Sequence, residues 1–133
     1  MFMLDTNIIS DAMRNPDGAV TRKIAAEIQS RLCTSVIVLC ELRFGLAKNN
    51  SKKLANQLTR VMSAIPVRPL DHNMVSHYTR VRNFLEQSGK IIGANDLLIA
   101  AHALSLDAVL VTDNEKEFSR VPGLRVENWL SAA

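Results

Sequence analysis

Residues 108–114, with the sequence AVLVTDN, are the clearest strand signal in the chain. An apolar run this short predicts a strand that is buried on both faces, as in a parallel sheet. A similar pattern stands at the N-terminus, where Phe2-Met3-Leu4 precedes Asp5. We therefore expect two parallel strands, each followed directly by an aspartate.

The segments outward from these strands carry helical spacing. Helices are predicted for residues 7–30 with a break at 15–18, then for 35–48, 51–64, 71–87 and 97–104, with a short turn at 115–118. Further strands are predicted at 31–34, near 67 and at 124–126. This alternation predicts an α/β fold, a single domain over residues 1–133 with a central parallel β-sheet flanked by helices on both faces.

The composition excludes some classes of protein. Hydrophobic residues make up 47% and charged residues 22% of the chain, which is typical of a soluble globular domain. No apolar run approaches the roughly 18 residues of a membrane span. The net charge of +3 permits a nucleic-acid partner, although one Trp and one Tyr are too few for a stacking platform. Cys33 and Cys40 lack a CxxC spacing, so we expect buried free thiols in a reducing cytosol.

Four acids are placed to meet at one edge of the predicted sheet. Asp5 and Asp113 follow strands, and Asp96 lies at the start of a predicted helix. Strand carboxyl ends and helix N-termini share that edge in a parallel α/β sheet. Glu41 stands roughly 9 Å along its own helix, and its side chain leans back toward the helix start. The sequence therefore predicts a cluster of Asp5, Glu41, Asp96 and Asp113.

Each aspartate also has a purely structural explanation. Asp5 and Asp96 are good helix N-caps, and Asp113 with Asn114 could form a turn. Glu41 is harder to explain in this way, because its helix is apolar nearly all round and is predicted to be buried. A buried carboxylate without a cation needs compensation, and Mg²⁺ or Mn²⁺ prefers such oxygen ligands. His72, His77 and His102 form no nucleophilic arrangement and are expected to be incidental.

Ordered motifs give the chain a family resemblance. They are LDTN at 4–7, S-x-x-x-x-x-E-L at 35–42, G-x-x-I-G at 89–93, D-x-x-I-A-A at 96–101 and VTDN at 111–114. The set resembles the PIN-domain ribonucleases and, more narrowly, the VapC toxins of bacterial toxin–antitoxin pairs. The resemblance runs from Met3 to about Trp129.

The resemblance implies a homodimeric endoribonuclease of the bacterial cytoplasm that needs Mg²⁺ or Mn²⁺ and inhibits translation. Its substrate is RNA, with tRNA the leading choice. It implies a VapB-type antitoxin that blocks the site with its C-terminal segment and carries all binding to operator DNA. The alternative is a non-catalytic PIN-like module that binds RNA or protein.

The resemblance also assigns roles to individual residues. Asp5, Glu41 and Asp96 match the three core acidic positions, and we choose Asp113 as the fourth, with Glu117 as its competitor. The side chains expected to orient the ligands or water are those of Thr6, Asn7, Thr112, Asn114 and Glu117. The cations expected to hold RNA are Arg14, Arg43, Lys48, Arg82 and Lys90.

Overall fold

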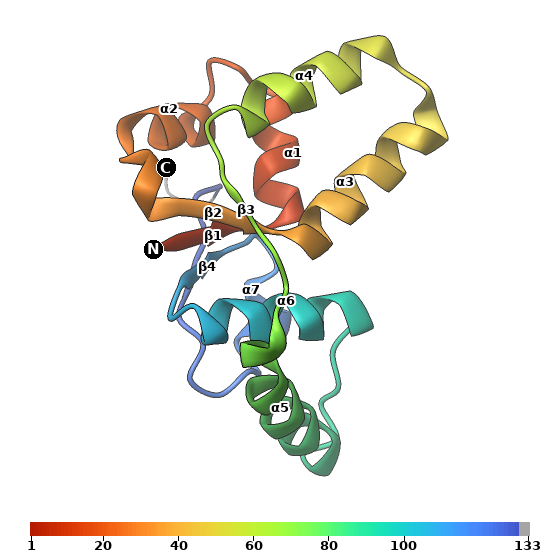
Figure 1. Ribbon diagram of the computed structural model, residues 1–133, viewed down its shortest axis with the longest axis vertical. Helices are drawn as coiled ribbons and strands as arrows, with labels where there is room; N and C mark the ends of the chain where they lie inside the picture. The colour runs from red at the N-terminus through yellow and green to blue at the C-terminus, as the bar shows by residue number, and fades with distance from the viewer. Residues whose placement is uncertain (131–133) are drawn as a thin grey trace.

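Five parallel strands form the centre of the molecule (Figure 1), in a computed structural model that describes residues 1–130. Their order is β3-β2-β1-β4-β5, and their bounds are β1 Phe2–Leu4, β2 Leu32–Ser35, β3 Val67–Arg68, β4 Val109–Val111 and β5 Val126–Glu127. On β1, Met3 is opposite Cys33 of β2 and Leu110 of β4. The predicted parallel sheet is confirmed. The last three residues of the predicted domain, 131–133, lie outside the described part.

Helices cover both faces of the sheet, as predicted. Their bounds are α1 Thr6–Arg14, α2 Ala19–Ala26, α3 Val36–Asn49, α4 Lys52–Met62, α5 Val75–Gln87, α6 Ala94–Ser105 and α7 Glu115–Phe118, with 3-10 turns at Gln29–Arg31 and His72–Met74. In Figure 1, α1 to α4 lie on one side of the strands and α5 to α7 on the other. No helix within residues 1–130 is long and apolar enough to cross a membrane.

The core is aliphatic and lies on both faces of β1 and β4. Met3, Ile8 and Ile99 are completely buried, as is Phe118 of α7. A fully buried side chain of this size contributes about 1.5–3 kcal/mol to stability, which holds the two helical layers on the sheet. This packing fixes the carboxyl ends of β1 and β4, where Asp5 and Asp113 were expected.

Helix α3 is more exposed than its sequence predicted. Val38 and Leu42 are its buried residues, while the ring of Phe44 is 65% exposed. The helix runs out from the sheet beside α4 and forms a projecting arm (Figure 1). An apolar sequence indicates burial only if neighbouring elements cover all sides of the helix. The expected burial of both cysteines is likewise half wrong, because Cys33 is buried and Cys40 is exposed.

Helix α6 starts earlier than predicted. It begins at Ala94 with Gly93 as its N-cap, so Asp96 lies inside the first turn and does not cap the helix.

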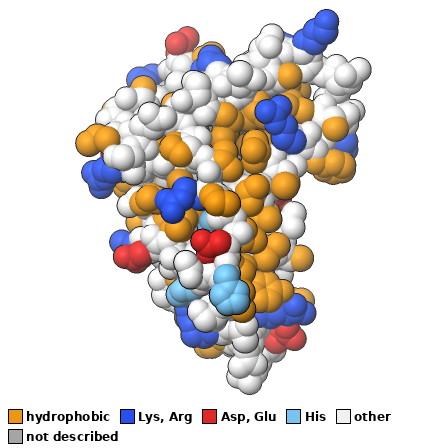
Figure 2. All heavy atoms as spheres, viewed as in Figure 1, with side chains coloured by type: hydrophobic (Ala, Val, Ile, Leu, Met, Phe, Trp, Pro, Cys, Tyr) orange, Lys and Arg blue, Asp and Glu red, His pale blue; other side chains and the backbone are white. Residues whose placement is uncertain are grey.

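Burial raises the pKa of the Cys33 thiol to about 11, which keeps it protonated. On the face shown in Figure 2, Lys and Arg side chains are scattered and a band of hydrophobic side chains runs between the arm and the lower helices.

Candidate functional site: a carboxylate cluster

Asp5 is held at the carboxyl end of β1 by three hydrogen bonds. Its amide donates to the Val111 carbonyl of β4 at 2.9 Å. Its carboxylate accepts from the Thr6 amide and from the Thr112 hydroxyl, both at 2.8 Å. Only 4% of the residue is exposed, and this burial raises the pKa of Asp5 against the opposing effect of these bonds. The charges of Glu41 and Glu117 raise it further.

Glu41 reaches the same place from the first turns of α3. The Thr6 hydroxyl donates to Glu41 Oε1 at 2.5 Å. Glu41 is half-buried, less than its sequence predicted, and within residues 1–130 it makes no ion pair. Thr6 therefore links two acids, since its amide bonds Asp5 and its hydroxyl bonds Glu41.

Asp96 and Glu117 form a carboxyl pair beside these two acids. Burial and a hydrogen bond with Glu117 raise the pKa of Asp96 to about 7. Burial alone would raise the pKa of Glu117, but bonds from the Gly93 amide, Asp96 and Asn114 lower it. The Gly93 amide donates to Glu117 Oε1 at 2.8 Å. These opposite shifts favour Asp96 over Glu117 as the group that holds a proton of the pair.

These four residues, Asp5, Glu41, Asp96 and Glu117, are called the acid cluster below. Asp113 lies at the end of β4, but its carboxylate turns outward and accepts from Asn128 at 2.9 Å. Its backbone amide donates to Asn7 Oδ1 at 3.0 Å. The structure thus brings together three of the four predicted acids and the named competitor for the fourth place. A ligand role for Asp113 stays a prediction.

The four other side chains predicted to orient the ligands or water form hydrogen bonds with the acids or with one another, and their role toward a ligand stays a prediction. Thr112 bonds Asp5 and accepts from the Asn114 amide at 3.0 Å. The Asn7 side chain donates to Thr112 Oγ1 at 3.4 Å, and the Asn114 side chain donates to Glu117. Together with Thr6, these residues fix the orientation of three carboxylates before any ligand is present.

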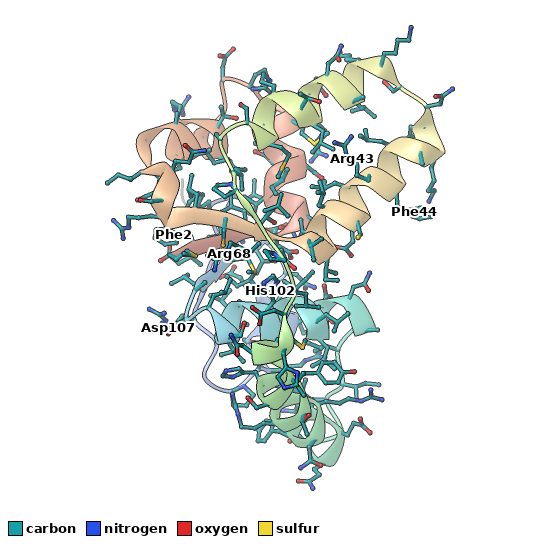
Figure 3. All side chains as sticks on the ribbon, viewed as in Figure 1. Phe2, Arg43, Phe44, Arg68, His102 and Asp107 are labelled. Atoms are coloured by element: carbon teal, nitrogen blue, oxygen red, sulfur yellow. The ribbon has the colours of Figure 1, made fainter. Side chains whose placement is uncertain are left out.

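The predicted RNA-binding cations are spread over the surface. Arg43 lies between α3 and α4, and Phe44 beside it points outward (Figure 3). Lys48 lies over the Phe44 ring, 5.3 Å from its centroid. Arg14 ends α1 and is exposed. Lys90 follows α5 and is also exposed.

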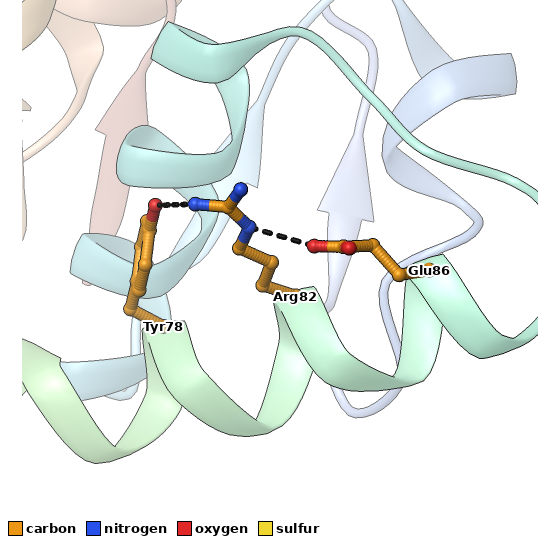
Figure 4. Close-up of polar contacts among 3 residues, drawn as sticks. All are labelled: Tyr78, Arg82 and Glu86. Atoms are coloured by element: carbon orange, nitrogen blue, oxygen red, sulfur yellow. Dashed lines mark hydrogen bonds and ion pairs between the residues drawn. The ribbon is translucent and has the colours of Figure 1, made fainter.

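Arg82 differs from the other predicted RNA-binding cations, because its guanidinium is already bound. It donates to Glu86 at 2.7 Å and to the Tyr78 hydroxyl at 2.9 Å (Figure 4). The hydrogen bond to Glu86 raises the pKa of Arg82. A neutralised guanidinium attracts a phosphate weakly, so Arg82 is the poorest of the five as a phosphate contact.

The donor chemistry of the acid cluster fits a hard divalent cation. All four groups offer carboxylate oxygens, which Mg²⁺ and Mn²⁺ prefer. Burial, the hydrogen bond with Glu117 and the neighbouring carboxylate charges raise the pKa of Asp96, and a bound cation would offset these effects. Within residues 1–130, no three acidic, His or Cys groups are already arranged as a metal site. A bound cation would therefore draw these side chains closer together, and Asp96 would release its proton.

Sequence reasoning missed three residues that complete the site. Gly93 has its Cα close to Asp96 and Glu117, so that an added Cβ would lie 3.5 Å from Asp96 Oδ2. Arg120 donates to the Ile91 carbonyl at 3.2 Å, and its charge lowers the pKa of Glu117. The Asn128 side chain donates to the Asp113 carboxylate and holds it away from the acid cluster. Gly93 ends the G-x-x-I-G motif, the one signal that pointed toward any of them.

Comparisons with known proteins agree with this geometry. The family described as PIN domain matches residues 2–124. Ribonuclease VapC2 of Rickettsia felis is 39% identical over 97% of this chain and 98% of its own length. The tRNA(fMet)-specific endonuclease VapC of Shigella flexneri is 35% identical over 96% of this chain and 97% of its own.

A solved structure extends the likeness to the fold. The crystal structure of VapBC2 from Rickettsia felis, bound to a DNA fragment from the promoter, has a chain that matches with a TM-score of 0.87 and 37% identity. The match covers 96% of this chain and 98% of that one. From the family match, the relatives and the shared fold together, we conclude that this chain belongs to the PIN-domain family and is a homologue of the VapC ribonucleases.

Proposed function

We propose that the protein is a Mg²⁺- or Mn²⁺-dependent endoribonuclease that acts as the toxin of a toxin–antitoxin pair. The observation that carries the proposal is the acid cluster, in which four carboxyl groups from the end of β1 and from α3, α6 and α7 meet. Burial and the hydrogen bond with Glu117 raise the pKa of Asp96 to about 7. Clustered acids with raised pKa values are costly for stability and are typical of functional sites. The names of the relatives, ribonuclease and endonuclease, support the same reaction class.

The residues of the chain would prepare hydrolysis of a phosphodiester. Asp5, Glu41, Asp96 and Glu117 would hold the cation, with Asp113 as the further candidate. When bound, the ion supplies an activated water and neutralises charge on the phosphate. Thr112 and the Thr6 amide keep the Asp5 carboxylate in one orientation, and the Gly93 amide does the same for Glu117. Cation binding is linked to the loss of a proton from Asp96.

We propose tRNA as the substrate, since a 35% identical relative is named a tRNA(fMet)-specific endonuclease. Cleavage would take place in the bacterial cytoplasm and inhibit translation. A VapB-type antitoxin is the proposed partner, because the matching solved structure is a VapBC complex. That complex binds promoter DNA, and we assign such binding here to the antitoxin. A homodimer is part of the same proposal.

The test is cleavage of total bacterial RNA and of purified tRNA by the antitoxin-free protein. Reactions contain Mg²⁺, Mn²⁺ or EDTA, and Asp5→Asn is the matched inactive variant. We expect discrete products with either metal, none with EDTA and none from Asp5→Asn. Mapping the cut ends identifies the bond.

Three other results would change the proposal. Products that persist in EDTA would contradict the metal dependence. A folded protein that Mn²⁺ stabilises but that cuts no RNA would favour the non-catalytic binding module. Cleavage of other RNA with intact tRNA would leave the nuclease standing and refute the proposed substrate.

A further inference from the structure

We propose that a groove between the end of α5 and the end of α7 binds a single-stranded stretch of RNA next to the bond that is cut. This inference rests on the proposed ribonuclease function and deepens it. The groove has a volume of about 330 Å³ and is lined by Phe84, Leu85, Ser88, Lys90, Ser119 and Arg120.

The groove shares a wall with the acid cluster. Arg120 lines it and also donates to the Ile91 carbonyl at 3.2 Å. Glu117 stands three residues before Arg120, and the Gly93 amide that bonds it stands two residues after Ile91. The loop from Ile91 to Gly93 thus lies between the groove and the carboxylates of the acid cluster. A strand that leaves the groove beside Arg120 would cross this loop to reach the acid cluster.

The charge of the groove is complementary to a phosphate backbone. Lys90 and Arg120 line it, and no carboxylate does. Neither cation takes part in an ion pair among the described residues. The carbonyl end of α5 does not need the Lys90 ammonium, because the amides of Gly89 and Lys90 already cap it. Lys90 is therefore free to attract a phosphate, and Arg120 would do so beside the Ile91 carbonyl and Glu117.

An exposed aromatic ring supplies a place for a base. The side chain of Phe84 is 47% exposed, although Leu85 beside it is buried. Every base has a face that stacks on such a ring, so the contact tolerates different sequences. The hydroxyls of Ser88 and Ser119 donate to backbone carbonyls, and their oxygens remain able to accept from a base or a 2′-hydroxyl.

Two other grooves among the described residues lack this combination. The one beside Tyr78 contains Arg82, whose charge Glu86 neutralises. The one on the arm contains Arg43 and Lys52 but no aromatic ring and no residue that contacts the acid cluster. Charge, stacking surface and a shared wall occur together at the α5–α7 groove, and this favours a nucleic-acid strand as its occupant.

The test measures binding separately from cleavage. Fluorescence anisotropy follows a labelled single-stranded RNA oligonucleotide with the full chain in EDTA, over a series of salt concentrations. We expect Phe84→Leu to weaken binding roughly five-fold or more, because a stacked base is lost. Lys90→Ala should lower the slope of log affinity against log salt by about 0.7, the effect of one phosphate contact on a single strand.

Matched controls come from the arm. Phe44→Leu removes a ring that is 65% exposed, and Lys53→Ala removes an exposed lysine of α4. Both should bind like the wild type. Equal effects of Phe84→Leu and Phe44→Leu, or an unchanged slope for Lys90→Ala, would overturn the inference.

Photocrosslinking gives a second readout. RNA that contains 4-thiouridine should form an adduct on the peptide with Phe84, and adducts only on other peptides would overturn the assignment. The two proposals fail in different ways. Cleavage by wild type together with control-like groove variants refutes the groove alone, whereas groove binding without any cleavage refutes the ribonuclease and leaves the groove as an RNA site.

Discussion

Two polar clusters lie at the carboxyl ends of neighbouring strands and differ in charge. The acid cluster follows β1, while Thr34, Ser35 and His102 form a neutral cluster at the end of β2. The Thr34 hydroxyl donates to the Leu4 carbonyl at 2.6 Å, and Ser35 Oγ lies 2.8 Å from His102 Nδ1. Burial lowers the pKa of His102, which favours its uncharged form.

The difference in charge indicates different roles: the neutral cluster serves stability and the acid cluster serves function. Neutral buried groups that bond one another stabilise the fold and specify how β2, α3 and α6 meet. Like-charged carboxyl groups held together cost stability, which protonation or a bound cation relieves. The acid cluster should therefore tolerate neutral substitutions in folding but not in activity, and the neutral cluster should behave in the opposite way.

The largest expected effect is the loss of cleavage in Asp5→Asn. We expect the rate to fall by at least about 10²-fold, as when a group that stabilises the transition state is removed. The free energy of unfolding should stay equal or rise, because a buried charge beside other acids is removed. Urea denaturation and initial cleavage rates, measured on the same preparation, test both points. A large fall in stability would mean that Asp5 acts mainly as a helix cap.

The variants Glu117→Gln and Asp113→Asn test which of the two residues is the fourth acid of the site. Glu117 lies with the other carboxylates, whereas Asp113 bonds Asn128. We expect Glu117→Gln to lower the cleavage rate by about 10- to 100-fold, the range for groups that support a metal site. Asp113→Asn should remain near wild type. The reverse order of the two cleavage rates would identify Asp113, and not Glu117, as the fourth acid.

Ser35→Ala should produce the opposite pattern from Asp5→Asn. Ser35 caps α3 through the Ile37 amide and bonds His102, so its loss should cost about 1–3 kcal/mol of unfolding free energy. Ser51→Ala is the matched control, because Ser51 caps α4 but bonds no buried partner. Urea denaturation should show the smaller loss for Ser51→Ala. A greater effect on cleavage than on stability would contradict the structural role of Ser35.

The smallest expected effect is on the pH dependence of stability in EDTA. The folded-state pKa of Asp96 is about 7 against an ordinary value of 3.8, so the folded state binds more protons between these values. Stability should therefore fall as pH rises from about 4 to 7. Asp96→Asn should flatten this part of the curve, and thermal unfolding over that range measures it. An unchanged slope in the variant would disprove the contribution of Asp96.

The contribution of His102 to stability changes with pH in the opposite direction from that of Asp96. This difference distinguishes the neutral cluster from the acid cluster. Because its folded-state pKa lies below 6.5, the unfolded state binds more protons as pH falls below that value. Stability is therefore lost on acidification through this group. Mn²⁺ should stabilise the protein more at alkaline than at acid pH, and this effect should depend on Asp96 and not on His102.

The sequence by itself determined the alternation of strands and helices and the convergence of three acids. Buried strands and amphipathic helices have local periods, so their positions can be predicted from neighbouring residues. Asp5 and Asp96 were located because the carboxyl edge of a parallel sheet follows from chain direction. Thr112 was named from the family resemblance, and it directly follows β4, the strand that pairs with β1.

Tertiary structure decided which way the remaining side chains turn. Asp113 follows its strand as predicted, but Asn128 from beyond β5 draws its carboxylate outward. Glu117 joins the acids because the Gly93 amide, 24 residues away, bonds it. The exposure of α3 depends on whether other elements cover it, and its own sequence carries no information on that. Orientation, burial and charge state are set by partners distant in the chain, so a local pattern does not specify them.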